Sequence, residues 1–329
     1  MRRDLTERIF KINDAESFRE VTLEIFYYQF ETNPVYREFI ISLGKRPEEV
    51  KLFSDIPFLP AEFFRNHEVV SENLPVEIIF ESSRSGGISA NRHFVSSLSL
   101  YEASFLGSFR LFYGEPSDYL IAATLPSYTD RNNSSLVYMM NSLISKSMHP
   151  YSGFYNDKIS DLITNLKEAK VKGDKILLIG VSFALLDLAE KYSPDLSGAI
   201  VMETGGMKGR RKEMTRQELH GVLTKNLNVP VIHSEYGMTE LMSQAYSKGE
   251  GLFYCPPWMR ILIRDPQDPL SIISEPGKTG GINIIDLANI YSCSFIATDD
   301  LGRLHEDGGF EVLGRFDNSD VRGCNLMAD

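Results

Sequence analysis

The sequence predicts an α/β protein in which a mainly parallel sheet, covered by helices, precedes a small β-rich subdomain. Between residues 76 and 248, short apolar runs alternate with helical patterns, as in a parallel sheet with helices on both faces. Beyond Gly249 the helical patterns fade, and prolines and glycines separate strand-like runs, which is typical of antiparallel pairing. A chain of 329 residues, 43% of them hydrophobic, is long enough to bury such a core.

Residues 1–75 are predicted to form an N-terminal helical segment. Asn13, with Glu16 three positions on, is the expected cap of its main helix. Asn33-Pro34 is expected to end that helix, because proline has no N–H group to continue the hydrogen-bond pattern. A second helical pattern then reaches about Leu43.

Residues 76–248 are predicted to form the α/β core. In such sheets, ligands bind beyond the carboxyl ends of the strands. The expected strands are 76–80, 119–124, 175–179, 199–202 and 229–233, and the expected helices begin near Ser134, near Phe183 and at the capping box of Thr215 and Glu218. The segments expected at the carboxyl ends are 125–128, 180–182, 203–206 and 236–240.

Residues 249–316 are predicted to form the β-rich subdomain, with strands such as 260–263 and 281–285. Residues 317–329 are expected to be a C-terminal tail. The chain contains no evident internal repeat or low-complexity tract.

The composition argues against nucleic-acid and membrane partners. The net charge is -11 and the pI is near 5.2, which opposes affinity for a phosphate backbone. No stretch approaches the roughly 20 apolar residues of a membrane span, and the first residues lack an apolar signal region, so we expect a cytoplasmic protein. Cys255, Cys293 and Cys324 have no CxxC spacing and suggest neither a disulfide framework nor a zinc cluster.

The segment Ser234–Glu240 is the expected centre of a ligand site. Gly237 lets the backbone approach a ligand closely. Tyr236 offers a stacking ring, Thr239 a hydroxyl donor for a phosphate, and Glu240 a hard oxygen ligand for Mg2+. These are the groups that a nucleotide requires.

Ser82 to Gly87, directly after the first expected strand of the core, combine small hydroxyl residues with glycines. Backbone N–H groups and hydroxyls in such a loop suit a phosphate. The segment does not match the GxxxxGK[ST] P-loop, and its composition alone suits a plain turn equally well.

Two sets of short segments carry a resemblance to known families. The first set is Ser82–Gly87, Tyr236–Glu240, Thr298–Asp300 and Gly314–Asp317. In order and approximate spacing it resembles the motifs of the adenylate-forming enzymes, which include acyl-CoA ligases and luciferase. The second set is Leu125–Tyr128, Ser134–Leu136, Thr204–Arg210, Glu218–His220, Asp286–Asn289, Ser292–Phe295 and Arg322–Leu326. With it, the chain resembles nearly end to end the acyl-protein synthetases of the bacterial luminescence fatty acid reductase complex (LuxE type).

The resemblance implies the large-domain fold of the adenylate-forming enzymes and a site for ATP and Mg2+. By that resemblance, the β- and γ-phosphates would be held by Ser82, Ser83, Ser85, Gly86 and Gly87, and the adenine would lie along Gly205 and Gly206. The base would stack on Tyr236 beside Gly237, the α-phosphate would contact Thr239, Mg2+ would bind Glu240, and the ribose hydroxyls would bind Asp300 and Arg315.

Cys324 is, by the same resemblance, the acceptor of an acyl group. An acyl-adenylate is electrophilic enough for a thiolate, and the charge of Arg322 lowers the pKa of a nearby thiol, whereas Asp320 and Asp329 oppose that effect. The implied function is an ATP-dependent acyl-protein synthetase. It would activate a fatty acid as acyl-adenylate, transfer the acyl group to Cys324 as a thioester, and deliver it to an acyl-CoA reductase-like partner.

The chain also departs from the family pattern. Arg84, Gly86 and Asp299 stand where the family usually has Gly, Thr and Gly. The mobile small domain that carries a catalytic lysine in most relatives is expected to be absent. Lys208, Arg210 or a lysine of a partner would then supply that charge.

Three other functions remain open. An acyl-CoA or aryl-CoA ligase would make the same adenylate but use an external acceptor. A degenerate adenylating fold, favoured by Arg84 and Asp299, would act as a scaffold and bind no Mg-ATP. A serine acyl hydrolase is suggested by Gly180–Ala184, which is close to a nucleophile elbow with Ser182 as nucleophile, but this function leaves Tyr236–Glu240 unexplained.

Overall fold

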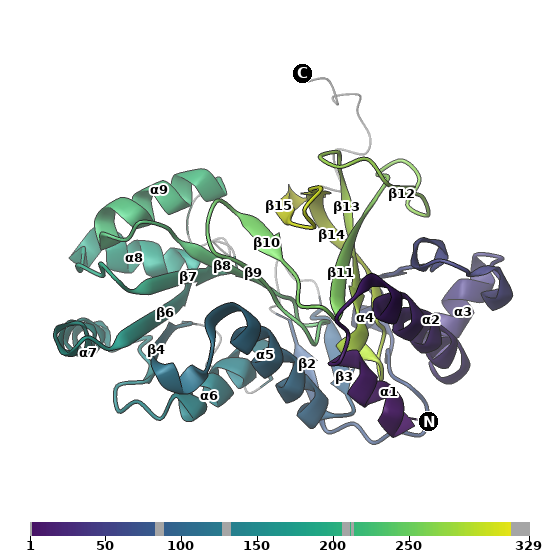
Figure 1. Ribbon diagram of the computed structural model, residues 1–329, viewed down its shortest axis with the longest axis horizontal. Coiled ribbons are helices and arrows are strands. Elements are labelled where there is room, and N and C mark those ends of the chain that lie inside the picture. The colour runs from purple at the N-terminus through teal and green to yellow at the C-terminus, as the bar shows by residue number, and fades with distance from the viewer. Residues whose placement is uncertain (1, 83–88, 127–132, 206–210, 212–213, 317–329) are drawn as a thin grey trace.

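The computed structural model describes residues 2–82, 89–126, 133–205, 211 and 214–316. Within them, one 13-stranded sheet is parallel at one end and antiparallel at the other, and helices flank it, so the predicted α/β class is confirmed (Figure 1). A separate antiparallel pair consists of β2 (Ile78–Glu81) and β3 (Arg92–Val95). The strand predicted at 76–80 belongs to this pair and not to the large sheet, because its hydrogen-bonding partner follows on the same hairpin.

The parallel half of the sheet positions the predicted ligand edge. Each strand in it runs in the same direction, so the carboxyl ends meet at one edge. The described parts of the four predicted segments include or directly follow the last residues of these strands. In spatial order the strands are β5 (Gly153–Phe154), β4 (Tyr119–Thr124), β6 (Lys175–Val181), β7 (Ile200–Thr204) and β8 (His233–Tyr236).

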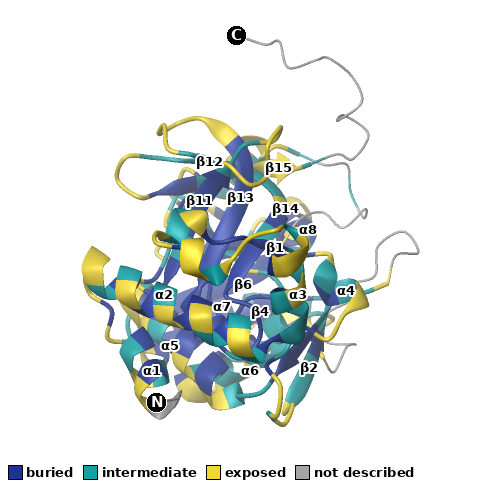
Figure 2. Ribbon diagram, turned by 90° about the vertical axis from the view of Figure 1, so that its right-hand side faces the viewer, coloured by how far each residue is buried: buried dark blue, intermediate teal, exposed yellow. Residues whose placement is uncertain are grey.

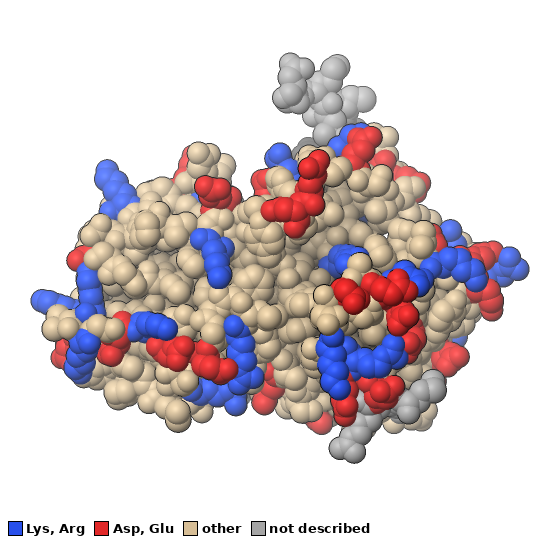
Figure 3. Space-filling model, viewed as in Figure 1, with Lys and Arg blue, Asp and Glu red and all other residues tan. Residues whose placement is uncertain are grey.

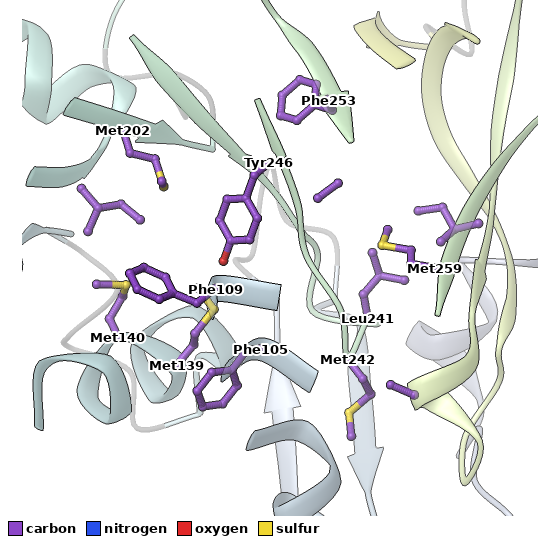
Figure 4. Packing of buried hydrophobic residues seen from close by; sticks show 14 of the residues in the cluster. Phe105, Phe109, Met139, Met140, Met202, Leu241, Met242, Tyr246, Phe253 and Met259 are labelled. Carbon is purple, nitrogen blue, oxygen red and sulfur yellow. The ribbon is translucent and has the colours of Figure 1, made fainter. Parts of the chain in front are cut away.

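Helices cover both faces of the parallel strands. In Figure 1, α8 and α9 lie over one face and α5 and α6 over the other. The helices of this half are α5 (Leu98–Tyr113), α6 (Ser135–Ser147), α7 (Ile159–Lys172), α8 (Ser182–Tyr192) and α9 (Arg216–Leu227). Figure 4 shows Phe105 and Phe109 of α5 with Met139 and Met140 of α6 packed on the side of the sheet that Met202 faces.

The antiparallel half continues the same sheet. β8 pairs in parallel with β7 and antiparallel with β9, so β8 is the strand at which the direction changes. The antiparallel pairing predicted beyond Gly249 is confirmed. The strands are β9 (Ala245–Ser247), β10 (Leu252–Tyr254), β11 (Met259–Arg264), β12 (Ile272–Ile273), β13 (Thr279–Asp286), β14 (Phe295–Leu304), β15 (Phe310–Arg315) and β1 (Leu59–Pro60), which adds to β14 in parallel.

The N-terminal helices pack beside the antiparallel strands (Figure 1). They bury one face and expose the other, as the alternating colours on α1 and α2 show in Figure 2. Buried Gln29 of α2 donates hydrogen bonds to the backbone oxygens of Asn289 and Ile290, which ties this helix to the sheet. The N-terminal elements are α1 (Arg2–Ile9), α2 (Ala15–Thr32), α3 (Pro34–Ser42), α4 (Phe63–Asn66) and the 3-10 turns η1 (Pro47–Glu49) and η2 (Phe53–Asp55). Two further 3-10 turns lie later in the chain: η3 (Pro116–Asp118) precedes β4, and η4 (Leu287–Asn289) follows β13.

Two predicted boundaries are wrong by a few residues. The cap of α2 is Asp14 and not Asn13, because Asp14 has the extended backbone and its carboxylate accepts from the N–H of Ser17 at 2.7 Å. The strand predicted at 229–233 begins only at His233, since Pro230 has no N–H to donate within a sheet.

The surface carries charges of both signs. On the face shown in Figure 3, basic and acidic side chains are interspersed around a broad area of other residues. In the described part of the chain, no helix has the length and apolar character needed to cross a bilayer.

The predicted capping box of α9 is present and can be tested. The Thr215 hydroxyl accepts from the N–H of Glu218 at 3.2 Å, and the Glu218 carboxylate accepts from the N–H of Thr215 at 2.8 Å. We expect Thr215→Ala to lower the free energy of unfolding by about 1 kcal/mol, because it removes the acceptor of one free N–H group. Urea denaturation measures this loss of unfolding free energy. Thr164→Ala, at an exposed position inside α7, is the control and should cause no such loss; equal effects of the two changes would contradict the capping role.

Candidate functional site

Tyr236, Asp300 and Arg315 converge at the ligand edge from β8, β14 and β15. The Tyr236 hydroxyl donates to Oδ2 of Asp300 at 2.7 Å, and Nε of Arg315 lies 3.4 Å from Oδ1 of the same carboxylate. Burial raises the pKa of Asp300, and the Tyr236 bond and the Arg315 charge offset part of that rise. The Arg315 side chain is 82% exposed, so its other donors face solvent and are available to a ligand.

Two phenylalanines fix the ring of Tyr236. The ring centroids of Phe253 and Phe310 lie 5.9 and 5.7 Å from that of Tyr236, and both contacts are edge-to-face. Such contacts, together with the Asp300 bond, hold the ring in one orientation. A ring held in this way presents a preformed surface for stacking.

Gly237 lies close to the side chain of Glu235. A Cβ atom at position 237 would lie 2.6 Å from Oε1 of Glu235, so this buried carboxylate would have to shift to make room for it. The Glu235 carboxylate is buried on the opposite face of β8 from Tyr236 and accepts from the Thr204 hydroxyl. Burial, with a smaller contribution from the charge of Glu203, raises the pKa of Glu235 to about 7, against the effect of the Thr204 bond.

The backbone of Thr239 and Glu240 is held by two buried side chains. Nδ1 of His93 lies 2.9 Å from the carbonyl oxygen of Thr239, and the Asn289 amide donates to the carbonyl oxygen of Glu240 at 2.7 Å. Nε2 of His93 in turn lies 3.0 Å from Oδ1 of Asn289. Burial lowers the pKa of His93 to about 4, although both contacts raise it.

The Glu240 carboxylate is buried, with 3% of the residue exposed, and accepts from the side-chain amide of Asn91. Burial raises the pKa of Glu240, and the Asn91 bond offsets part of that rise. A cation would favour the ionised form further. No group of three His, Cys, Asp or Glu among the described residues is arranged to hold a metal. A single carboxylate of this kind is what Mg2+ uses where phosphates and water supply most of its other ligands.

The phosphate-loop and adenine candidates are described only in part. Ser82 lies directly after β2, and its hydroxyl accepts from the N–H of Asn91 at 2.9 Å. Gly205 directly follows β7 and has a φ of 61°, a conformation that favours glycine. The remaining candidates, Ser83, Ser85, Gly86, Gly87, Gly206, Lys208 and Cys324, lie outside the described residues.

Ser182 does not form a hydrolytic triad. Its hydroxyl donates to the carbonyl oxygen of Gly205 at 2.7 Å and lies 3.3 Å from Oε2 of Glu203. The other oxygen of Glu203 lies 3.7 Å from Nε2 of His220, so a carboxylate separates the serine from the imidazole. A serine nucleophile needs the imidazole itself as base, and this arrangement does not provide one.

Several site residues were not predicted from the sequence. Asn91 and His93 stand alone in their segments, without a motif around them. Asp286 and Asn289 belong to a segment that carries the family resemblance, and that segment was the only signal for them. All four contact the chain between Thr239 and Ser243.

The fold is similar to that of solved enzyme structures. ATP-bound MatB from Rhodopseudomonas palustris matches with a TM-score of 0.53 and 16% identity over 73% of this chain and 48% of that one. O-succinylbenzoate coenzyme A synthetase (MenE) from Bacillus subtilis, in complex with ATP and magnesium, matches with a TM-score of 0.50 and 18% identity over 72% and 49%. The chain spans about half the length of these enzymes. The predicted large-domain fold is confirmed.

Sequence similarity identifies one particular relative of this chain. The chain is 24% identical over 326 residues to the long-chain-fatty-acid--luciferin-component ligase of Vibrio harveyi. The matched region covers 92% of this chain and 84% of that protein. No family model matches the chain. The predicted resemblance to the LuxE type is confirmed.

Glu235→Gln is expected to remove a pH dependence of stability. A carboxyl group whose pKa is raised to about 7 by folding binds its proton more tightly in the folded state than in the unfolded chain. The unfolding free energy of the wild type should therefore fall by about 3 kcal/mol as the pH rises from 4 to 8. The variant keeps an oxygen for Thr204 and should lack that fall.

Urea denaturation at pH 5 and pH 8 measures this effect. Glu38→Gln, on the exposed face of α3, is the matched control and should keep the wild-type dependence. An equal difference between Glu235→Gln and wild type at both pH values would contradict the raised pKa.

Proposed function

We propose that the protein is an ATP-dependent ligase that activates a carboxylic acid as acyl-adenylate and then carries the acyl group on Cys324. The observation that carries the proposal is the convergence of Tyr236, Asp300 and Arg315 at the sheet edge that also bears Glu240. A stacking ring, a ribose acceptor, an exposed guanidinium and a buried carboxylate together match the parts of Mg-ATP.

The nucleotide would bind along this edge. The adenine would stack on the ring of Tyr236, and the backbone at Gly205 would lie along the base. The ribose hydroxyls would donate to the carboxylate of Asp300 and accept from the free N–H groups of Arg315. The segment that begins at Ser82 would hold the β- and γ-phosphates.

In the first step, a carboxylate oxygen of the acid attacks the α-phosphorus of ATP. The bond between that phosphorus and the bridging oxygen to the β-phosphate breaks, and pyrophosphate leaves. Glu240 would hold Mg2+, which neutralises charge on the phosphate oxygens. The Thr239 hydroxyl would donate to the α-phosphate, and His93 and Asn289 keep its backbone in place. Lys208 is the proposed additional cation.

In the second step, the Cys324 thiolate attacks the acyl carbonyl carbon. A thioester forms, AMP leaves with the bonding electrons, and the thiol proton passes to solvent. The similarity to a ligase named for long-chain fatty acids supports a fatty acid as substrate. An acyl-CoA reductase-like protein is the proposed recipient of the acyl group. Cys255 and Cys293 are poorer nucleophiles, because burial raises the pKa of both thiols.

An acyl-CoA ligase is the second candidate. The fold likeness to a coenzyme A synthetase favours it. The two functions share the adenylate and differ in the acceptor, so one experiment separates them. A non-catalytic scaffold would form neither product.

Cys324→Ser is expected to permit acyl-adenylate formation and to abolish the acyl-enzyme. The measurement is intact-protein mass spectrometry after incubation with Mg-ATP and carboxylic acids of graded chain length. Wild type should gain a hydroxylamine-sensitive acyl mass that maps to Cys324, because a thioester is cleaved by hydroxylamine. Cys255→Ala is the control and should be labelled like wild type. Labelling that survives Cys324→Ser would rule out this acceptor, and adenylate without any adduct would favour the acyl-CoA ligase.

Glu240→Gln is expected to slow the first step roughly 100-fold, because it removes the charge that would hold the metal while keeping the side-chain shape. Exchange of labelled pyrophosphate into ATP measures this step without the acceptor cysteine. Glu62→Gln, at an exposed position before α4, serves as the control. Unchanged exchange in Glu240→Gln would remove Glu240 from the metal site.

A further inference from the structure

Asn91 closes the base of the hairpin formed by β2 and β3. The N–H of Ser82 donates to the carbonyl oxygen of Asn91 at 3.0 Å, and the N–H of Asn91 donates to the Ser82 hydroxyl at 2.9 Å. The two bonds extend the ladder in which Glu81 pairs with Arg92. Both bonds use backbone groups of Asn91 and fix it relative to the start of the proposed phosphate-binding segment. The side chain of Asn91 is therefore left for another role.

The side-chain amide of Asn91 donates to Oε1 of Glu240, which is 149 positions away in the sequence. The Glu240 carboxylate is buried, and the Asn91 amide fixes one of its two oxygens. A bond to a charged acceptor is stronger than one between neutral groups. The contact therefore orients the carboxylate.

The backbone of Glu240 is held by a different residue. The Asn289 amide donates to the Glu240 carbonyl oxygen, and His93 contacts the preceding carbonyl. Removal of the Asn91 amide thus leaves the position of the Glu240 backbone fixed. The same amide makes one further, longer contact, to the carbonyl oxygen of Ala61 at 3.5 Å.

We propose that Asn91 is a positioning residue for the metal. It holds Oε1 of Glu240, leaves Oε2 for the ion, and couples this carboxylate to the proposed phosphate-binding segment that begins at Ser82. The inference rests on the proposed function and extends it to a residue outside the motifs that suggest that function. Because Asn91 is neutral, it adds no charge to the site.

Asn91→Ala keeps both backbone bonds to Ser82 and removes the amide. Isothermal titration calorimetry without any acid substrate measures binding before chemistry occurs. We expect the dissociation constant of Mg-ATP to rise about 10-fold, as for loss of one hydrogen bond to a charged group. Binding of AMP in EDTA should change less than about 2-fold, because AMP without metal does not use Glu240. Asn133→Ala, at an exposed position whose backbone oxygen receives the N–H of Glu81, is the control and should bind like wild type.

A double-mutant cycle with Glu240→Gln tests whether Asn91 acts through Glu240. In that background Asn91→Ala should add little to the loss of Mg-ATP binding, whereas independent effects would multiply. Multiplied effects, equal losses for Mg-ATP and AMP, or no loss at all would each overturn the role of Asn91. If wild type makes acyl-adenylate but Asn91→Ala binds Mg-ATP normally, only this inference fails. If wild type binds Mg-ATP no more tightly than AMP in EDTA, both this inference and the metal site of the proposed function fail.

Discussion

The carboxylate of Asp286 holds the loop that follows β8, and the geometry of the site depends on it. Oδ2 accepts from the N–H groups of Met242 and Ser243 at 2.7 and 3.0 Å, and Oδ1 accepts from the Ser243 hydroxyl at 2.6 Å. Burial raises the pKa of Asp286 to about 6, and the donors oppose that rise. Because Asp286 ends β13, this contact joins the antiparallel half of the sheet to the end of the parallel half. Thr239 and Glu240 lie between two fixed points, the end of β8 and the pinned residues after it.

The site is therefore assembled from segments that are far apart in the chain. The hairpin of β2 and β3 supplies Asn91 and His93, the turn after β13 supplies Asn289, and β14 supplies Asp300. No segment alone contains all of these candidate residues. The change of direction at β8 makes this possible, since it places antiparallel strands next to the edge where the parallel strands end.

Local patterns predicted most of the elements but few of the contacts between them. The periodicity over 119–124 and 175–179 identified buried strands, and the spacing of Thr215 and Glu218 identified a helix start, because these signals depend on neighbours in sequence. Asn91 and His93 gave no such signal, since their roles depend on where a hairpin docks. Gly237 was predicted for close approach of a ligand, yet the structure gives it a second reason, the nearby oxygen of Glu235.

Asp299, where the family usually has glycine, lies next to Asp300, the proposed ribose-binding residue. Its side chain is exposed, and its backbone has no positive φ that would require glycine. The orientation of Asp300 is set by other groups: its N–H donates to the Thr298 hydroxyl at 3.1 Å, and that hydroxyl donates to the carbonyl oxygen of Ile282 at 2.9 Å. The guanidinium of Arg264 donates to the carbonyl oxygen of Thr298. Since these bonds fix the residue on either side of position 299, the orientation of Asp300 does not depend on a glycine there.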